Sequence, residues 1–348
     1  MLNFKWNLPE TYEVRNTNSM VRTKVPDIPV FRYMENEEVD VKVQRYFSFE
    51  GKDMSYWIGD LEEEMVARVA MSKYLTTRQL YEFMYLAGEC DSREKIERRI
   101  KKLVKCHVLQ ECNLIVPGEI EEGHSLHCYK LGHWGFRIAR DMGVCFHKGI
   151  AYHSARKLQE LGIEEDSAVD VKRILAGNQI LLGLLKSKVS MERFGVMETF
   201  RPVCDDAECF DGEKNTLFRS TVNVKIDEYS ILAYDVVRDF PEAYEKIEDK
   251  FRRYCNLVEC RQYGESNYHN YKEVPQIVYC GESFEHNCKI KDYLKEKGLW
   301  DKGVTVLFTE DLLNVQDNSR SIYEIAADGS RVWYELPTKT KNDNERVA

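Results

Sequence analysis

Hydrophobic positions recur with a helical period in three consecutive segments of the first half of the chain. The segments begin near residue 61, at Thr76 and at Asp91. Asp60 is the expected N-cap of the first helix, residues 61–72, and acidic residues follow it. Thr76 and Asp91 each precede a Gln or Glu by three residues, which is the spacing of a capping box. The pattern therefore predicts three helices joined by short turns.

The third of these segments has a one-sided hydrophobic stripe. Its apolar residues fall at positions i, i+4, i+7 and i+8, and they are Ile96, Ile100, Leu103 and Val104. This spacing is typical of an amphipathic helix whose apolar stripe packs against a core. We therefore expect the stripe to face inward and the intervening charged residues to face solvent.

Two strand-like runs follow the helices, at residues 108–116 and 125–131, with a turn-prone acidic stretch between them. Gly132 interrupts the second run, and a short helix is expected over residues 134–142, ended by Gly143. Three helices, a strand, a hairpin loop and a strand are the order of a winged helix-turn-helix. The order and tight spacing predict such a domain at residues 60–145.

The second half of the chain has a different order of predicted elements. A helical connector at residues 148–161 and a long helix at 166–186 lead into it. Strands and helices are then expected as a meander followed by βαβαβ, with strands at 194–203, 217–226, 230–237, 276–280 and 304–309 and helices at 241–257 and 282–297. This order predicts a mixed sheet flanked by helices.

The expected fold class is α+β: a winged helix-turn-helix followed by an α/β domain with a mixed sheet. The first 55 or so residues have no sustained period, although residues 39–49 alternate as an edge strand would. The expected divisions are an irregular leader (1–59), the winged helix (60–145), a helical connector (146–190), the α/β domain (191–337) and a flexible tail (338–348).

Composition indicates in which compartment the protein is expected. No stretch approaches the roughly 20 apolar residues of a membrane span, and the opening residues lack the apolar core of a signal peptide. The eleven cysteines are scattered and odd in number, without the spacing of a disulfide framework. We therefore expect a cytoplasmic protein with reduced thiols and no membrane partner.

Charge is distributed unevenly. The chain has a net charge of −9, which opposes contact with nucleic acid over most of its surface. Residues 92–105, SREKIERRIKKLVK, contain seven Lys or Arg and two Glu, the strongest local asymmetry in the sequence. A nucleic-acid footprint should therefore be confined to the third helix.

In a helix-turn-helix this helix enters the major groove, where Arg and Lys reach phosphates and guanine edges. The alternative is a solvated helix face whose charges only aid solubility. The candidate contacts to double-stranded DNA are Thr77, Arg78, Ser92, Arg93, Lys95, Arg98, Arg99, Lys101, Lys102, Lys105 and Lys130.

The hairpin loop is acidic, with Glu119, Glu121 and Glu122, and would repel phosphate. A loop that contacts protein instead of DNA is a fair interpretation. Its base holds the donors His124, His127 and Lys130.

Two groups of residues are candidate zinc ligands: His124, His127, Cys128 and His133, and the pair Cys204 and Cys209. The chain contains no C-x-x-C pair, and His127 and Cys128 point to opposite faces of a strand, so buried free thiols are favoured and no metal or other cofactor is expected.

Signatures of catalysis are incomplete. The chain has no G-x-S-x-G elbow, no glycine-rich phosphate loop and no H-E-x-x-H. Asp227 and Asp235 lie on consecutive strands, as in metal-dependent nucleases, but Val237 occupies the place of the expected lysine, and Arg238 would face the other side. We expect the two acids to lie at strand ends facing solvent, and no catalytic residues.

The segments SKYLTTRQLYEF, RRIKKLVKCHVLQ, CYKLGHWGFRIARDMG and KRILAGNQILLGLL resemble the replication-relaxation family, which includes plasmid mobilisation accessory proteins. The resemblance extends loosely over the α/β half, through LAYDVVRDFPEAYEKIEDKFRRY, and covers about residues 62–313. It implies DNA binding beside a relaxase at a transfer or replication origin, together with a degenerate domain like that of restriction endonucleases.

The leading hypothesis is a non-enzymatic DNA-binding accessory protein of a plasmid or conjugative element, with a relaxase or other mobilisation protein as partner. Two alternatives stay open: a metal-dependent nuclease of the mobile element, and a winged-helix transcriptional regulator. The oligomeric state is open as well, a homodimer included.

Overall fold

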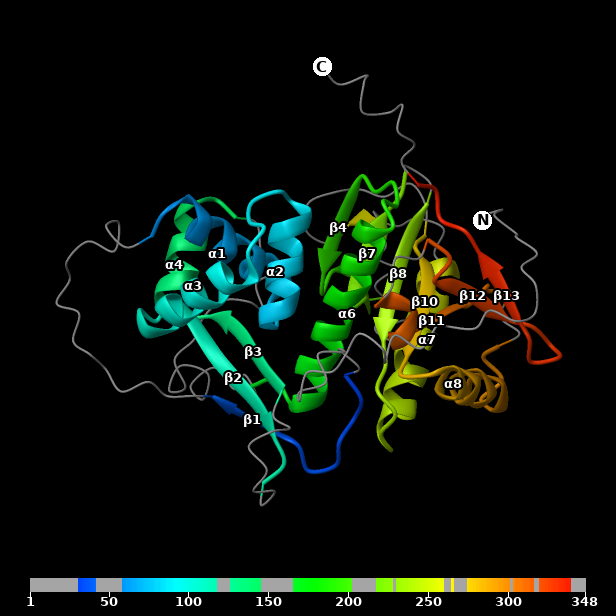
Figure 1. Ribbon diagram of the computed structural model, residues 1–348. Coiled ribbons are helices and arrows are strands. Elements are labelled where there is room, and N and C mark those ends of the chain that lie inside the picture. Colours follow the sequence, from blue (N-terminus) through cyan, green and yellow to red (C-terminus); the bar gives the residue numbers. More distant parts are fainter. Residues whose placement is uncertain are drawn as a thin grey trace, which may run out of the picture. The chain divides into compact units, whose positions relative to one another are not determined.

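The computed structural model describes residues 31–41, 58–117, 126–144, 165–201, 217–227, 230–259, 264–265, 274–300, 303–315 and 319–338. Within these ranges the chain is a mixed α+β protein (Figure 1). It divides into two compact units. The N-terminal unit contains Met34–Asn178, and the sheet unit contains Gln179–Ala348 together with Ile28–Tyr33. In the described ranges no helix is long and apolar enough to cross a membrane.

The N-terminal unit contains helices and a small antiparallel sheet. Its elements are β1 (Glu38–Val41), α1 (Asp60–Ser72), α2 (Thr77–Leu86), α3 (Arg93–Lys105), β2 (Leu109–Ile115), β3 (Leu126–Leu131) and α4 (His133–Asp141). The strands are ordered β1-β2-β3. The expected edge strand exists, but β1 is described only over four residues, and it pairs with β2. The connector expected at 148–161 lies outside the described residues.

The helix starts differ in part from the expected ones. Thr76 caps α2, and its capping box with Gln79 is confirmed, with Gln79 N donating to Thr76 Oγ1 over 3.2 Å. The N-cap of α3 is Ser92 and not Asp91, because Ser92 Oγ accepts from Lys95 N over 3.3 Å. Asp60 is also wrong as an N-cap, since α1 begins there and Gly59 precedes it.

Two glycines allow α4 to approach the turn between α3 and β2. A Cβ on Gly135 would lie 2.0 Å from the carbonyl oxygen of Val108, and one on Gly132 would lie 2.4 Å from that of His107. Gly132 N donates to Val108 O over 2.8 Å and Trp134 N to His107 O over 3.2 Å. Any larger residue would separate these backbones. The glycine that interrupts the hydrophobic pattern therefore marks a close backbone contact.

The sheet unit is built on one seven-stranded mixed sheet, ordered β13-β12-β11-β10-β8-β7-β4. Its strands are β4 (Arg193–Val196), β7 (Val222–Lys225), β8 (Ile231–Val236), β10 (Gln276–Gly281), β11 (Leu307–Glu310), β12 (Ile322–Ile325) and β13 (Arg331–Tyr334). Strands β8, β10 and β11 are parallel, with α7 (Ala243–Glu259) and α8 (Phe284–Glu296) as their connections. The expected βαβαβ arrangement is confirmed.

Two expected strands are each divided in two. The run at 194–203 becomes β4 and β5 (Thr199–Arg201), because Met197 between them has a left-handed φ of 58°. The run at 217–226 becomes β6 (Phe218–Arg219) and β7. Strands β5 and β6 join β9 (Gly264–Glu265) in a separate small sheet. The hairpin β12–β13 was not expected at all.

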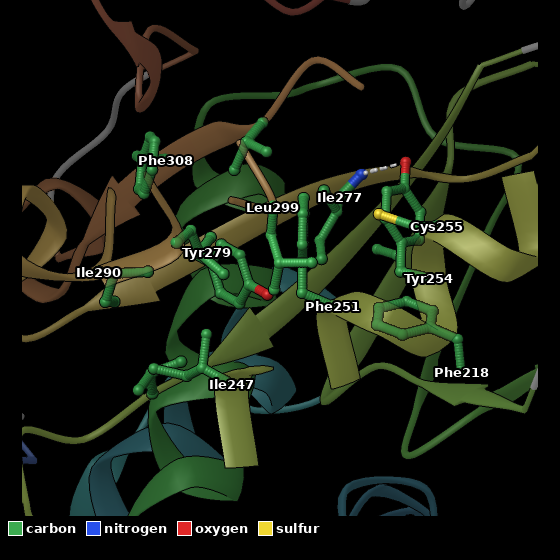
Figure 2. Packing of buried hydrophobic residues seen from close by; sticks show 14 of the residues in the cluster. Phe218, Ile247, Phe251, Tyr254, Cys255, Ile277, Tyr279, Ile290, Leu299 and Phe308 are labelled. Carbon is green, nitrogen blue, oxygen red and sulfur yellow. Dashed lines mark hydrogen bonds between the residues drawn. The ribbon is translucent and has the colours of Figure 1, made fainter. Parts of the chain in front are cut away.

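The hydrophobic core of the sheet unit lies between the parallel strands and helices α7 and α8. Aromatic rings fill it, including Phe251 and Tyr254 from α7 and Tyr279 from β10 (Figure 2). The buried Tyr254 hydroxyl donates to Pro275 O over 2.8 Å and accepts from Ile277 N over 3.3 Å. Tyr254 is thus tolerated in this core because its polar atom is satisfied.

The long helix α6 (Ala168–Lys186) contains the division between the two units, which falls after Asn178. In the N-terminal unit, the buried Asn178 amide donates to Ser72 O over 3.0 Å and to Tyr74 O over 2.8 Å. Gln79 Nε2 donates to Leu175 O over 2.8 Å. These bonds attach the first part of α6 to the turn between α1 and α2.

Candidate nucleic-acid interface

Helix α3 has one buried and one charged face. Ile96, Ile100, Leu103 and Val104 are all buried, which confirms the expected stripe. The seven Lys and Arg residues of the helix lie outside that stripe, and the structure divides them by their partners.

One group is held by acidic side chains. Arg99 donates to Glu62 Oε1 on α1 over 2.8 Å, and Lys102 contacts the same oxygen over 3.4 Å. The Glu62 side chain is only 4% exposed, and its carboxylate contacts these two cations in place of water. Arg93 pairs with Glu97 one turn later, over 3.0 Å. Arg99 and Lys102 thus attach α3 to α1, a role that sequence reasoning missed.

The other group is exposed and has no acidic partner among the described residues. It consists of Lys95, Arg98, Lys101 and Lys105, which we call the basic face. These positions recur every three or four residues and therefore lie on one side of the helix. Glu94, also exposed, is the acidic residue at the N-terminal end of this side. Among the described residues, no ion pair has to break before the basic face approaches a polyanion.

The remaining candidate contacts lie outside the basic face, and three of the four have structural partners. Arg78 pairs with Glu82 on α2 over 2.9 Å, and Thr77 Oγ1 donates to the Tyr129 hydroxyl over 3.4 Å. Ser92 is the cap of α3. Lys130 lies half-buried on β3, opposite Gln110 of β2.

The acidic residues of the loop and half of the candidate zinc ligands lie outside the described residues; they are Glu119, Glu121, Glu122, His124, Cys204 and Cys209. At the base of the hairpin His127 is exposed and contacts Glu111 over 3.3 Å, whereas Cys128 is buried. The two therefore do point to opposite faces. Over the described ranges, no group of three His, Cys, Asp or Glu side chains is placed to hold a metal ion.

The two candidate nuclease acids, Asp227 and Asp235, differ in their exposure to solvent. Asp227 is exposed after β7, as expected. Asp235 on β8 is fully buried, so the expectation that it faces solvent is wrong. Lys250 of α7 forms an ion pair with it, and Thr221 Oγ1 lies 3.5 Å from its carboxylate. A lysine does contact Asp235, but it comes from a helix fifteen residues later and not from the strand, which a strand pattern cannot show.

Arg238, which follows Val237 just after the end of β8, is completely buried. It donates to both carboxylate oxygens of Asp311, over 2.6 and 3.0 Å, and to Phe31 O over 2.9 Å. Burial opposes its charge, yet Asp311 holds the pKa of the guanidinium above its ordinary value. This cation is therefore a structural element of the sheet unit.

Comparisons with known proteins give no match: no family model, no curated protein and no solved structure is similar to this chain.

Proposed function

We propose that the N-terminal unit is a winged helix-turn-helix that binds duplex DNA, with α3 in the major groove and the β2–β3 hairpin as the wing. The observation that carries this proposal is the basic face of α3, four exposed cations on one side of a helix. The order of α1, α2, α3, β2 and β3 also supports it.

The physical reason is electrostatic. A cation already held by a buried acid must lose that partner before it meets a phosphate, whereas an exposed cation loses only water and counterions. Release of counterions from DNA favours binding by such cations. Arg98 can also donate two hydrogen bonds to a guanine edge, as can a lysine. The basic face is thus the part of α3 suited to DNA.

Protection of lysines from acetylation tests this placement in the wild-type protein. Duplex DNA should slow the modification of Lys95, Lys101 and Lys105, measured by mass spectrometry of peptides. Lys246 and Lys295, exposed on α7 and α8, are the matched controls and should react at the same rate with and without DNA. Equal protection of all five lysines would contradict a confined footprint.

We further propose that the protein is an accessory factor of a plasmid or conjugative element and acts with a relaxase. The net charge of −9 should keep its affinity for random duplex weak at physiological salt. A basic partner would offset this repulsion. Affinity for origin DNA should therefore rise when the relaxase is added, and an unchanged affinity would remove the partner from the proposal.

The sheet unit, on this proposal, does not cut DNA. Lys250 pairs with the buried acid Asp235, an arrangement that stabilises the sheet and α7. Supercoiled plasmid incubated with the protein and Mg²⁺ or Mn²⁺ should stay intact. Nicking that is lost in Asp235→Asn would instead support the nuclease alternative.

A further inference from the structure

Two cysteines face each other across strands β2 and β3 of the N-terminal unit. Cys112 and Cys128 are paired in the antiparallel register, and both are fully buried with free thiols. A hydrogen bond joins the two thiols. In the part of the chain that the structure describes, no other strand register places two cysteines opposite each other.

The backbone spacing at this pair can be derived from the neighbouring residue. Tyr129 N donates to Leu75 O over 2.8 Å, and Leu75 N donates to Tyr129 O over 3.1 Å, so the peptide groups of Tyr129 point away from β2. Pairs alternate along antiparallel strands, so the next pair, Cys112–Cys128, is the hydrogen-bonded kind, with a Cα separation of about 5.5 Å. Disulfides span Cα separations of about 4.4–6.8 Å. The Cα spacing of the two strands therefore lies within the range of a disulfide, whereas the Cβ atoms of such a pair, about 5.5 Å apart, must come about 1 Å closer to bond.

The two thiols are also chemically unequal. The hydrogen bond from Cys128 lowers the pKa of Cys112, against the effect of burial, and Lys130 acts in the same direction. The same hydrogen bond, together with burial, raises the pKa of Cys128. Because the thiolate is the nucleophile, Cys112 is the better nucleophile of the two once peroxide reaches this buried pair.

We propose that Cys112 and Cys128 form a reversible disulfide when the protein meets hydrogen peroxide. The Cys112 thiolate attacks one peroxide oxygen, the O–O bond breaks, and the second oxygen leaves as water after taking a proton. The sulfur of Cys128 loses its proton and attacks the resulting sulfenic acid, the S–O bond breaks, and a second water leaves. Two thiols are oxidised and one peroxide is reduced.

The bond would join β2 and β3 directly and restrict the unfolded chain. A cross-link that closes a loop of this length should raise the melting temperature of the N-terminal unit by about 5–10 °C. The reduced and oxidised protein would therefore differ measurably in stability, whatever the unit binds.

Peptide mapping of the wild-type protein tests the proposal. The folded protein is treated with hydrogen peroxide, unfolded, alkylated at its remaining thiols, digested and analysed by mass spectrometry. We expect a cross-linked peptide that joins Cys112 to Cys128, lighter by two hydrogens than its reduced parts and separated by dithiothreitol. Cys106 and Cys288, which are partly exposed, serve as controls and should be recovered outside this link.

Recovery of Cys112 and Cys128 as alkylated thiols, or as sulfinic acids, would overturn the proposal. The double variant Cys112→Ala/Cys128→Ala gives a second readout, since it should lose the rise in melting temperature after peroxide. Cys90→Ala, at another buried cysteine of the same unit, should keep the rise. If the double variant does not fold, the peptide map of the wild type still decides.

Discussion

The cations of α3 and those of the sheet unit show how burial decides what a positive charge does. Lys95, Arg98, Lys101 and Lys105 are exposed, without an acidic partner among the described residues. In the sheet unit Arg238 is buried against Asp311, and the 5% exposed Lys291 donates to the carbonyls of Ile325 and Ala326 over 2.7 Å each. The first group is available to a ligand, and the second stabilises the fold. Each group can be tested by removing its charge.

The largest effect is expected for Arg238→Met, which removes the guanidinium but keeps an apolar side chain. The carboxylate of Asp311 would be left buried without its main partner, so the free energy of unfolding should fall by about 3–5 kcal/mol. Urea denaturation measures it. Arg252→Met, at an exposed pair with Glu248 on α7, is the control and should change stability by no more than about 0.5 kcal/mol. Equal losses of stability in the two variants would contradict the claim that the buried pair stabilises the fold more than the exposed pair.

A second prediction concerns His286, a buried group near the same cation. Burial lowers its pKa to about 4, and Arg238 and Lys289 add to this, although Asp239 opposes it. Its Nδ1 accepts from Glu282 N over 3.1 Å, which requires the neutral ring. The unfolded chain takes up this proton near pH 6.5 and the folded chain only near 4, so stability is full above 6.5 and falls between these values.

The free energy of unfolding should fall by about 2–3 kcal/mol between pH 6.5 and 4 because of His286. It is measured as the difference in this pH dependence between the wild type and His286→Asn, whose side-chain oxygen can still accept from Glu282 N. A variant with the same slope as the wild type would show that another group causes the loss.

A smaller effect is expected for Glu62→Ala in the N-terminal unit. The change removes the acceptor of Arg99 and Lys102, whose charge-assisted bonds should contribute about 2 kcal/mol to stability. It also frees both cations, so affinity for duplex DNA should rise. Glu94→Ala, an exposed acid on α3, is the control for stability. DNA affinity is compared at a temperature where the variant is still folded. A lower affinity of Glu62→Ala than of the wild type would contradict the view that Glu62 withholds Arg99 and Lys102 from DNA.

Much of the fold follows from local pattern, and much of the interior does not. The stripe of α3 and the parallel strands β8, β10 and β11 were predictable because period and length identify them. The pair Arg238–Asp311 joins residues 73 positions apart, and Lys250 reaches Asp235 from another element. No local period encodes such contacts. The division of the cations on α3 depended in the same way on Glu62, which belongs to a different helix.

The salt dependence of duplex binding tests the central claim most directly. Fluorescence anisotropy would compare the wild type, Arg98→Ala/Lys101→Ala and the matched control Lys246→Ala/Lys295→Ala over a salt series. Each phosphate contact contributes about 0.9 to the slope of log affinity against log salt, so the first variant should lose up to about 1.8 and the control nothing. A folded Arg98→Ala/Lys101→Ala protein with the wild-type slope and affinity would contradict the assignment of the basic face to DNA.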